Sequence, residues 1–150
     1  MLAGRSVPAH VDSRDAVKVA RNPDSIHQPL AAYAHQIEIS GSERLLVLSG
    51  QVGMTREGAI PEDPGEQLEV ALDNVVANLE AAGMQVADLV KLTLYLTTQI
   101  DAHKRRAVLS ERLQGHAPCM TLVYVAGLAS PALKVEVDAW ASADDRSQRT

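Results

Sequence analysis

The sequence predicts one α+β domain in which two helices pack on one face of a sheet and leave the other face to be covered. The order of elements is the main evidence, since two or three strands are followed by a helix, a strand, a second helix and two last strands. A length of 150 residues fits a single domain. We expect residues 1–15 to form a flexible arm, residues 16–141 to form the domain and residues 142–150 to be a disordered tail.

Up to three short strands are expected before the first helix. Valines alternate with more polar residues over 16–20, and two further strands, residues 33–39 and 45–53, lie on either side of a Ser-Gly-Ser turn. These two are predicted to pair as a hairpin. Gly50 lies near the end of the second, where a missing side chain would let a ligand or another backbone come close. The alternative is that Gly50 merely ends a strand.

The helices are predicted from apolar spacing and from their caps. From Glu66 onward, apolar residues recur at the i, i+3, i+4, i+7 spacing of one buried face, and Gly83 ends the helix. Asp101 is expected to cap a second helix that reaches about Leu113 and closes at Gly115. The residues expected to point inward from this helix are Ala107, Val108, Leu109 and Leu113.

Three further strands complete the expected sheet. Residues 90–96 and 133–139 alternate between apolar and polar, and residues 118–125 form a β-branched, half-buried run that begins at a proline. The face opposite the helices carries aromatic side chains that a monomer would not readily leave in water, namely Tyr95, Tyr124 and Trp140. The sequence therefore predicts an oligomer with clefts where subunits meet.

Composition and charge exclude several classes of function. The 14 basic and 19 acidic residues give a net charge of −5, and aromatic residues make up 3%, so a nucleic-acid partner is not expected. No apolar run approaches the roughly 20 residues that cross a bilayer, so no membrane association is expected. One cysteine cannot form an internal disulfide, and no signal peptide is recognised, so we expect a cytoplasmic protein.

Metal ligands and nucleophiles lack supporting neighbours in the sequence. The histidines show no ligand-like spacing, so no metal site is expected. His116 and Cys119 lie three residues apart, but a Cys–His pair needs its base within hydrogen-bond reach and a third group to orient it. The sequence offers no such third group, so we do not expect a cysteine nucleophile.

Several stretches of the sequence match, in order, those of a known family. They are Ser49-Gly50-Gln51, residues 72–75 and 79–83, residues 88–96, residues 118–126 and residues 134–139. Together they resemble the RidA/YjgF family of reactive intermediate deaminases over about residues 33–141. The resemblance implies a chorismate-mutase-like α+β fold and a homotrimer whose sheets form a central barrel with three ligand clefts between subunits. It also implies hydrolysis of enamines and imines to keto acids and ammonia without a metal or cofactor.

The family's signature strand is altered here. Pro118-Cys119-Met120-Thr121 stands where active deaminases have Pro-Ala-Arg followed by Ser or Thr, so Met120 replaces the arginine expected to grip the substrate carboxylate. A thioether offers only dispersion and weak acceptance at that place. Without the resemblance, Met120 is typical of a core or pocket-wall methionine. The family acid that holds the attacking water falls on Glu136, and the family's cleft tyrosine falls on Tyr33.

Further ligand-binding positions follow from the same resemblance. Ser49 and Gly50 match residues that line the family's cleft, and Thr121 belongs to the signature strand. Arg106 aligns with a family asparagine in the second helix, which offers a second route for a guanidinium into the cleft. On charge pattern alone, the basic run at residues 104–106 is typical of a solvated helix face, and this alternative stays open.

Two classes of function compete. The first is a metal-free imine or enamine hydrolase in which Glu136 positions water and groups near Ser49, Gly50 and Thr121 polarise the substrate. Because loss of a bidentate arginine pair costs on the order of 2–5 kcal/mol, its substrate is expected to differ from the usual carboxylate-bearing iminoacids. The second is a homotrimeric small-ligand-binding or regulatory protein that has lost deaminase activity, with Glu136 an ordinary solvated carboxylate.

Overall fold

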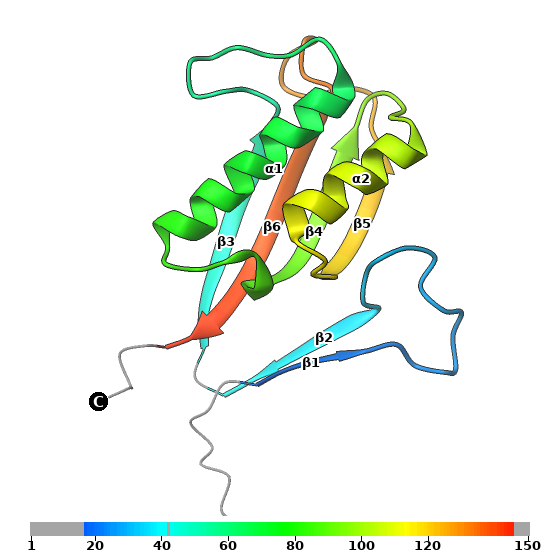
Figure 1. The fold of residues 1–150 in the computed structure, drawn as a ribbon, viewed down its shortest axis with the longest axis vertical. Helices are drawn as coiled ribbons and strands as arrows, with labels where there is room; N and C mark the ends of the chain where they lie inside the picture. The colour runs from blue at the N-terminus through cyan, green and yellow to red at the C-terminus, as the bar shows by residue number, and fades with distance from the viewer. Residues whose placement is uncertain (1–16, 42, 146–150) are drawn as a thin grey trace, which may run out of the picture.

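A four-stranded sheet with two helices on one face forms the body of the molecule (Figure 1). The computed structural model describes residues 17–41 and 43–145. The strands of this sheet are β3 (Glu43–Val52), β4 (Leu89–Leu96), β5 (Cys119–Tyr124) and β6 (Val135–Asp144). Their order is β3-β6-β4-β5, in which β4 and β5 run parallel and the other pairs run antiparallel. The predicted α+β class, with both helices on one face, is confirmed.

The longer helix, α1 (Pro64–Ala81), begins two residues before the predicted Glu66. Asp63 caps it, because its carboxylate accepts a hydrogen bond from the N–H of Glu66 at 2.9 Å. Pro64 suits the first turn, where a backbone N–H would have no helical partner. Gly83 follows the last turn with a φ of +67°, which confirms it as the residue that ends the helix.

The shorter helix, α2 (Ala102–Leu113), is capped by Asp101 as predicted. The Asp101 carboxylate accepts a hydrogen bond from the N–H of Lys104 at 3.0 Å. Leu113 is buried, but Ala107, which was predicted to point inward, is exposed. At 3.6 residues per turn Ala107 lies about 120° round the helix from Leu113, which turns it away from the sheet.

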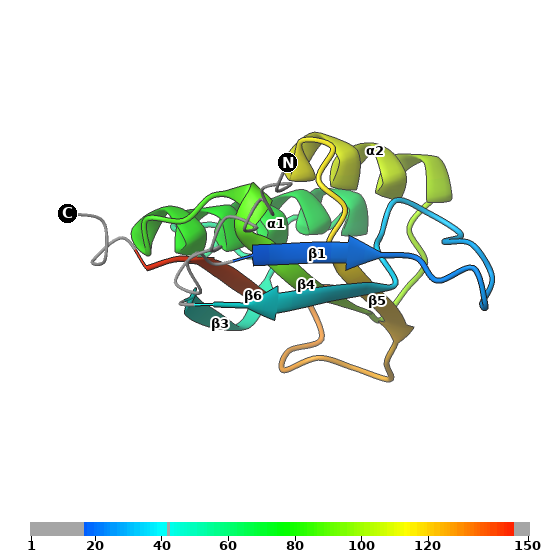
Figure 2. The same ribbon diagram turned by 90° about the horizontal axis from the view of Figure 1, so that it is seen from below.

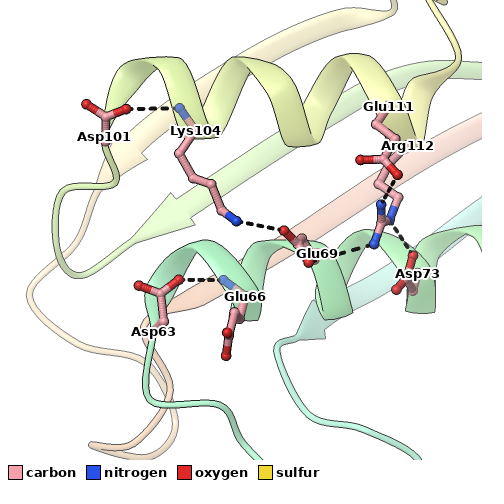
Figure 3. A network of polar contacts seen from close by, with 8 residues as sticks. All are labelled: Asp63, Glu66, Glu69, Asp73, Asp101, Lys104, Glu111 and Arg112. Carbon is pink, nitrogen blue, oxygen red and sulfur yellow. Dashed lines mark hydrogen bonds and ion pairs between the residues drawn. The ribbon is translucent and has the colours of Figure 1, made fainter.

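Charged side chains join the two helices on their outer surface (Figure 3). Arg112 of α2 contacts Asp73 of α1 at 2.7 Å and Glu69 at 3.9 Å, and it also pairs with Glu111 at 3.0 Å. Lys104 contacts Glu69 at 3.0 Å. Both Lys104 and Arg112 of α2 therefore form ion pairs that connect α2 to α1.

The core lies between the helices and the sheet. One stripe of α1 and alternate residues of β4 and β6 are buried, as their apolar spacing predicts. The residues that face the opposite side of β4 and β6 are partly exposed, so the second face of the sheet stays open in a single chain. Core members include Leu68, Leu72, Val75, Leu92, Leu94, Val108, Leu113, Val135 and Val137.

A separate two-stranded ribbon, β1 (Val17–Arg21) and β2 (Gln36–Ser40), lies beside the main sheet (Figure 2). The predicted hairpin of residues 33–39 with residues 45–53 is wrong, because β2 pairs with β1 and β3 pairs with β6. β3 and β6 have ten residues each, whereas β2 has five. The longer pairing satisfies more backbone N–H and C=O groups, which the short β2 could not do.

The last strand continues past the predicted end of the domain at residue 141. β6 reaches Asp144 and pairs there with the start of β3, so the expected tail begins too early. Ser142 is fully buried, and its carbonyl accepts a hydrogen bond from Lys18 Nζ of β1 at 2.5 Å. The expected arm at residues 1–15, like residues 146–150 of the expected tail, lies outside the described residues.

Candidate functional site

A β-bulge in β3 lies at the candidate site and sets the direction of the strand there. Leu48 pairs with Ala139 of β6, and the next paired residue of β3 is Gln51, which faces Val137. Two residues of β3, Ser49 and Gly50, therefore stand opposite one residue of β6. A bulge of this kind bends the strand and redirects its side chains, and bulges are frequent beside active sites.

Gly50 leaves room for the side chain of Glu136, which lies against it. A Cβ placed on Gly50 would stand 1.7 Å from Oε1 of Glu136 and 2.6 Å from its Cδ. A side chain at residue 50 would displace the Glu136 carboxylate, so the glycine lets this carboxylate of β6 lie against the bulged backbone of β3. The sequence predicts that a ligand or another backbone comes close to Gly50, whereas the group that lies against it in the structure is the Glu136 side chain.

The Glu136 carboxylate has no protein partner in the part of the chain that the structure describes. It accepts no hydrogen bond and forms no ion pair there, although the residue is half-buried. An ionised carboxylate can only accept hydrogen bonds, and partly buried polar groups are usually satisfied by the protein or by water. Glu136 is thus free to accept a hydrogen bond from water or from a ligand N–H.

A recess of about 260 Å³ opens beside this carboxylate on the open face of the sheet. Within it, the hydroxyl of Tyr95 donates a hydrogen bond to Oδ2 of Asp138 at 2.9 Å. This bond, with burial and the nearby charges of Asp138 and Glu136, raises the pKa of Tyr95 above its ordinary value. The residues that line the recess are Gly50, Tyr95, Val125, Gly127, Leu128, Glu136 and Asp138.

Tyr95 and Asp138 were not predicted as site residues. The signal for Asp138 is its place two residues after Glu136, since a strand with a period of two puts both carboxylates on one face. Tyr95 stands directly opposite Glu136 in the register of β4 with β6. The alternation was recognised in the sequence, but strand partners are needed to see that the three side chains share one recess.

A second and larger cavity, of about 400 Å³, lies between α2, β5 and residues 30–32. Met120 reaches it from β5, where the parallel register pairs it with the buried Leu92 and so places it on the helix-covered face. Arg106 reaches it from α2. The lining residues are Leu30, Ala31, Ala32, Arg106, Leu109, Ser110, Leu113, Gly115, His116 and Met120.

The other predicted site residues lie outside both cavities. The hydroxyl of Tyr33 accepts a hydrogen bond from the N–H of Leu30 at 3.2 Å. Oγ1 of Thr121 accepts one from Lys91 Nζ at 2.5 Å on the open face of the sheet. Ser49 is exposed at the bulge. Tyr33, Thr121 and Ser49 therefore remain predicted ligand contacts without a cavity of their own.

The predicted site residues fall into two groups within one chain. Gly50 and Glu136 share the recess on the open face, whereas Arg106 and Met120 share the cavity on the helix-covered face. The sheet separates the two groups, so a single chain cannot present all four residues to one small molecule.

Two other chemistries find no support in the described residues. His116 Nε2 donates a hydrogen bond to the carbonyl of Leu89 at 2.7 Å, so this nitrogen is not the base of a Cys–His pair. Burial raises the pKa of the Cys119 thiol, which keeps this thiol protonated. No three His, Cys, Asp or Glu side chains within residues 17–41 and 43–145 gather as metal ligands do. Over the same residues, no helix is long and apolar enough to cross a bilayer.

The architecture and the recess define a two-layer α+β protein with an unpaired carboxylate on the open face of its sheet. A family model described as Endoribonuclease L-PSP matches residues 24–143. The 2-iminobutanoate/2-iminopropanoate deaminase of Escherichia coli (strain K12) is 33% identical over 99 residues, which cover 63% of this chain and 77% of the relative. The chain therefore belongs to this family, that of the RidA/YjgF proteins.

Solved structures agree with this assignment. YyfB from Yersinia pestis, a Rid family protein of unknown function, is similar with a TM-score of 0.73 and 27% identity, over 83% of this chain and 97% of that chain. The YjgF gene product of E. coli is similar with a TM-score of 0.59 and 34% identity, over 65% and 79% of the two chains. E. coli TdcF with bound serine has a TM-score of 0.59 and 32% identity over the same shares.

Proposed function

We propose that this protein hydrolyses a small imine or enamine to a carbonyl compound and ammonia without a metal or cofactor. The observation that carries the proposal is the half-buried Glu136 carboxylate, which lies against Gly50 and has no partner among the described residues. A carboxylate in this state can take a proton from a bound water molecule. The names of two E. coli relatives, an iminobutanoate/iminopropanoate deaminase and a putative reactive intermediate deaminase, support the same reaction class.

In the proposed reaction, Glu136 holds a water molecule against the imine carbon. The carboxylate takes one proton as the water oxygen bonds to that carbon, and it passes this proton to the nitrogen to give a carbinolamine. The remaining hydroxyl proton then moves through Glu136 to the nitrogen as the carbon–nitrogen bond breaks, so that the carbonyl compound and ammonia leave. Groups near Ser49, Gly50 and Thr121 polarise the carbon–nitrogen bond. An enamine follows the same path after it tautomerises to the imine.

The proposed substrate differs from the iminoacids whose carboxylate the family arginine is expected to grip. Met120 occupies that position and contributes an apolar wall to a cavity on the helix-covered face. A thioether cannot form the bidentate, charge-assisted pair that a guanidinium forms with a carboxylate. A substrate that relies on this position for its charge therefore binds weakly.

The proposed active form is a homotrimer with ligand clefts between subunits. The open face of the sheet exposes large apolar side chains, with Leu45 57%, Val47 55% and Trp140 45% exposed. Such a face is stabilised when another copy covers it. Assembly also offers a way for the recess of one copy to meet the cavity of its neighbour, which one chain cannot achieve.

The second candidate is a small-ligand-binding or regulatory trimer without catalysis. The replacement of arginine by Met120 favours it, because a family member that no longer grips its substrate keeps a pocket but loses turnover. In this case the Glu136 carboxylate serves only to bind a ligand N–H.

The two candidates are separated by a direct assay. Imines generated in solution are mixed with the protein, and release of the carbonyl product and of ammonia is followed over time. We expect hydrolysis above the uncatalysed rate, and Glu136→Gln is expected to reduce it about 100- to 10,000-fold because the proton acceptor is lost. Glu80→Gln, an exposed glutamate on α1, is the matched control. Hydrolysis by Glu136→Gln at the wild-type rate would exclude the proposed mechanism, and binding without turnover would support the second candidate.

A further inference from the structure

We infer that the cavity between α2 and β5 binds an organic anion with an apolar body, and that Arg106 holds its negative charge. The inference rests on the proposed function in one respect, which is that this cavity forms part of the ligand site. It goes further in naming the ligand class and the residue that selects it.

The size and walls of the cavity suit the body of a small organic molecule. Its volume of about 400 Å³ falls within the range of roughly 300–1,000 Å³ that is usual for ligand pockets. Its apolar lining residues include Leu30, Leu109, Leu113 and Met120. Walls of this kind favour an aromatic ring or a branched hydrocarbon, because each buried carbon leaves water.

The charge at the cavity has one sign. No aspartate or glutamate belongs to the lining, and its ionisable members are Arg106 and His116. His116 Nε2 faces the carbonyl of Leu89 at 2.7 Å, and because a carbonyl oxygen only accepts hydrogen bonds, this nitrogen is a donor that is already used. Arg106 is therefore the permanently charged group at the cavity.

The guanidinium of Arg106 has no hydrogen-bond or ion-pair partner among the described residues, whereas the other long basic side chains of α2 each have one. Within the described residues the side chain of Arg106, an exposed residue, makes no hydrogen bond or ion pair. By contrast, Lys104 contacts Glu69 at 3.0 Å, Arg105 donates to the carbonyl of Ile100 at 3.4 Å, and Arg112 pairs with carboxylates of both helices. A free guanidinium fork beside an apolar cavity is matched by a carboxylate, with which it forms two parallel hydrogen bonds.

Both parts of such a ligand are needed for affinity. A short anion such as acetate gains the contact with Arg106 but leaves the apolar walls in water. A neutral molecule of the same body gains the walls but not the charge-assisted pair. The cavity thus selects carboxylates that carry a bulky apolar group, because Arg106 on the helix meets the charge and the apolar walls, which include Met120 on the strand, cover the body.

Equilibrium binding tests this inference with 3-phenylpropanoate, its neutral amide and acetate as probes in titration calorimetry. We expect 3-phenylpropanoate to bind the wild-type protein about ten- to hundred-fold more tightly than the amide, which is the effect of one charged hydrogen-bonded pair. Arg106→Gln is expected to bring the carboxylate down to the affinity of the amide. Arg105→Gln, whose side chain does not line the cavity, is the matched control and is expected to bind as wild type.

Three outcomes would overturn the inference: equal affinity for carboxylate and amide, unchanged binding by Arg106→Gln, or no binding of 3-phenylpropanoate. A thermal melt of each variant confirms that it is folded. The proposed function fails separately, since Glu136→Gln is expected to reduce imine hydrolysis about 100- to 10,000-fold while it leaves 3-phenylpropanoate binding intact. If Arg106→Gln binds normally but Glu136→Gln is inactive, the reaction stands and the ligand class is wrong.

Discussion

The Oε1 atom of Glu136 occupies the space in which a side chain at Gly50 would begin, since a Cβ there would stand only 1.7 Å away. The bulge in β3, the glycine within it and the carboxylate of β6 therefore form one unit. A side chain at residue 50 moves the carboxylate, and a change at residue 136 removes the reason for the glycine. This coupling can be measured.

Gly50→Ala is expected to destabilise the protein by about 1–3 kcal/mol, because the added methyl group overlaps the Glu136 carboxylate. In a Glu136→Ala background the same substitution is expected to cost much less, since the overlapping group is gone. Urea unfolding of the four proteins measures both costs. An equal loss of unfolding free energy in the two backgrounds would mean that the overlap with Glu136 is not what makes Gly50→Ala destabilising.

Gly50→Ala also bears on the proposed reaction. Displacement of the carboxylate by about 1 Å is expected to lower imine hydrolysis by about a hundredfold, because misplaced groups lose most of their catalytic effect. Gly127→Ala is the control, since a Cβ at that position in the same recess meets nothing within 4 Å. A Gly50→Ala protein that is stable, folded and fully active would contradict the role given to Glu136.

The Tyr95 phenol is expected to lose its proton at a higher pH than an ordinary tyrosine. Its hydrogen bond to Asp138, with burial and the nearby carboxylates, raises its pKa. A proton held more tightly in the folded than in the unfolded protein stabilises the fold below the ordinary pKa, and that stability is lost as pH rises through the raised value. Stability is therefore expected to fall in the alkaline range above about pH 10.

Ultraviolet absorbance of the phenolate, compared between wild type and Tyr95→Phe, isolates this titration. Asp138→Asn is expected to lower the pKa of Tyr95, because it removes the negative charge that opposes ionisation. Asp24→Asn, an exposed change in the loop after β1, is expected to leave it unchanged. An identical Tyr95 titration in Asp138→Asn would show that the Asp138 carboxylate does not govern the pKa of this group.

Gln67 is expected to be the most sensitive polar residue for folding. It is fully buried, its Nε2 donates to the carbonyls of Pro61 at 2.8 Å and Ala132 at 2.9 Å, and its Oε1 accepts from the N–H of Lys134 at 2.8 Å. Gln67→Leu leaves these backbone groups without partners, which is expected to cost about 2–5 kcal/mol in urea unfolding. Gln99→Leu, at an exposed position, is expected to change stability by less than about 0.5 kcal/mol.

Trp140 is expected to lie in the contact between copies. It is 45% exposed on the open face and stands opposite Val47, which is 55% exposed. Trp140→Glu places a charge in this contact and is expected to reduce the mass measured by light scattering from a trimer to a monomer. Ala77→Glu, exposed on α1 at the other side of the sheet, is expected to leave the mass unchanged. A wild-type protein that is monomeric at all concentrations would contradict the proposed trimer.

Local patterns were enough to predict most of the elements. The alternation in β4, the helical spacing of α1, the caps at Asp101 and Gly83 and the small residue at Gly50 each depend on neighbours within a few positions, where the physical rules are strong. The order of these elements then predicted the α+β class. The matching stretches of sequence also predicted the correct family.

Only the tertiary structure decided which strands pair and which side chains meet. Pairing depends on competition among segments far apart in the chain, so the hairpin predicted from a nearby turn gave way to the longer pairing of β3 with β6. The same long-range register brought Tyr95 and Asp138 beside Glu136, left that carboxylate without a partner in the described chain, and separated it from Arg106 and Met120. Residue types can be read along the chain, but whether a charge is paired or free depends on packing.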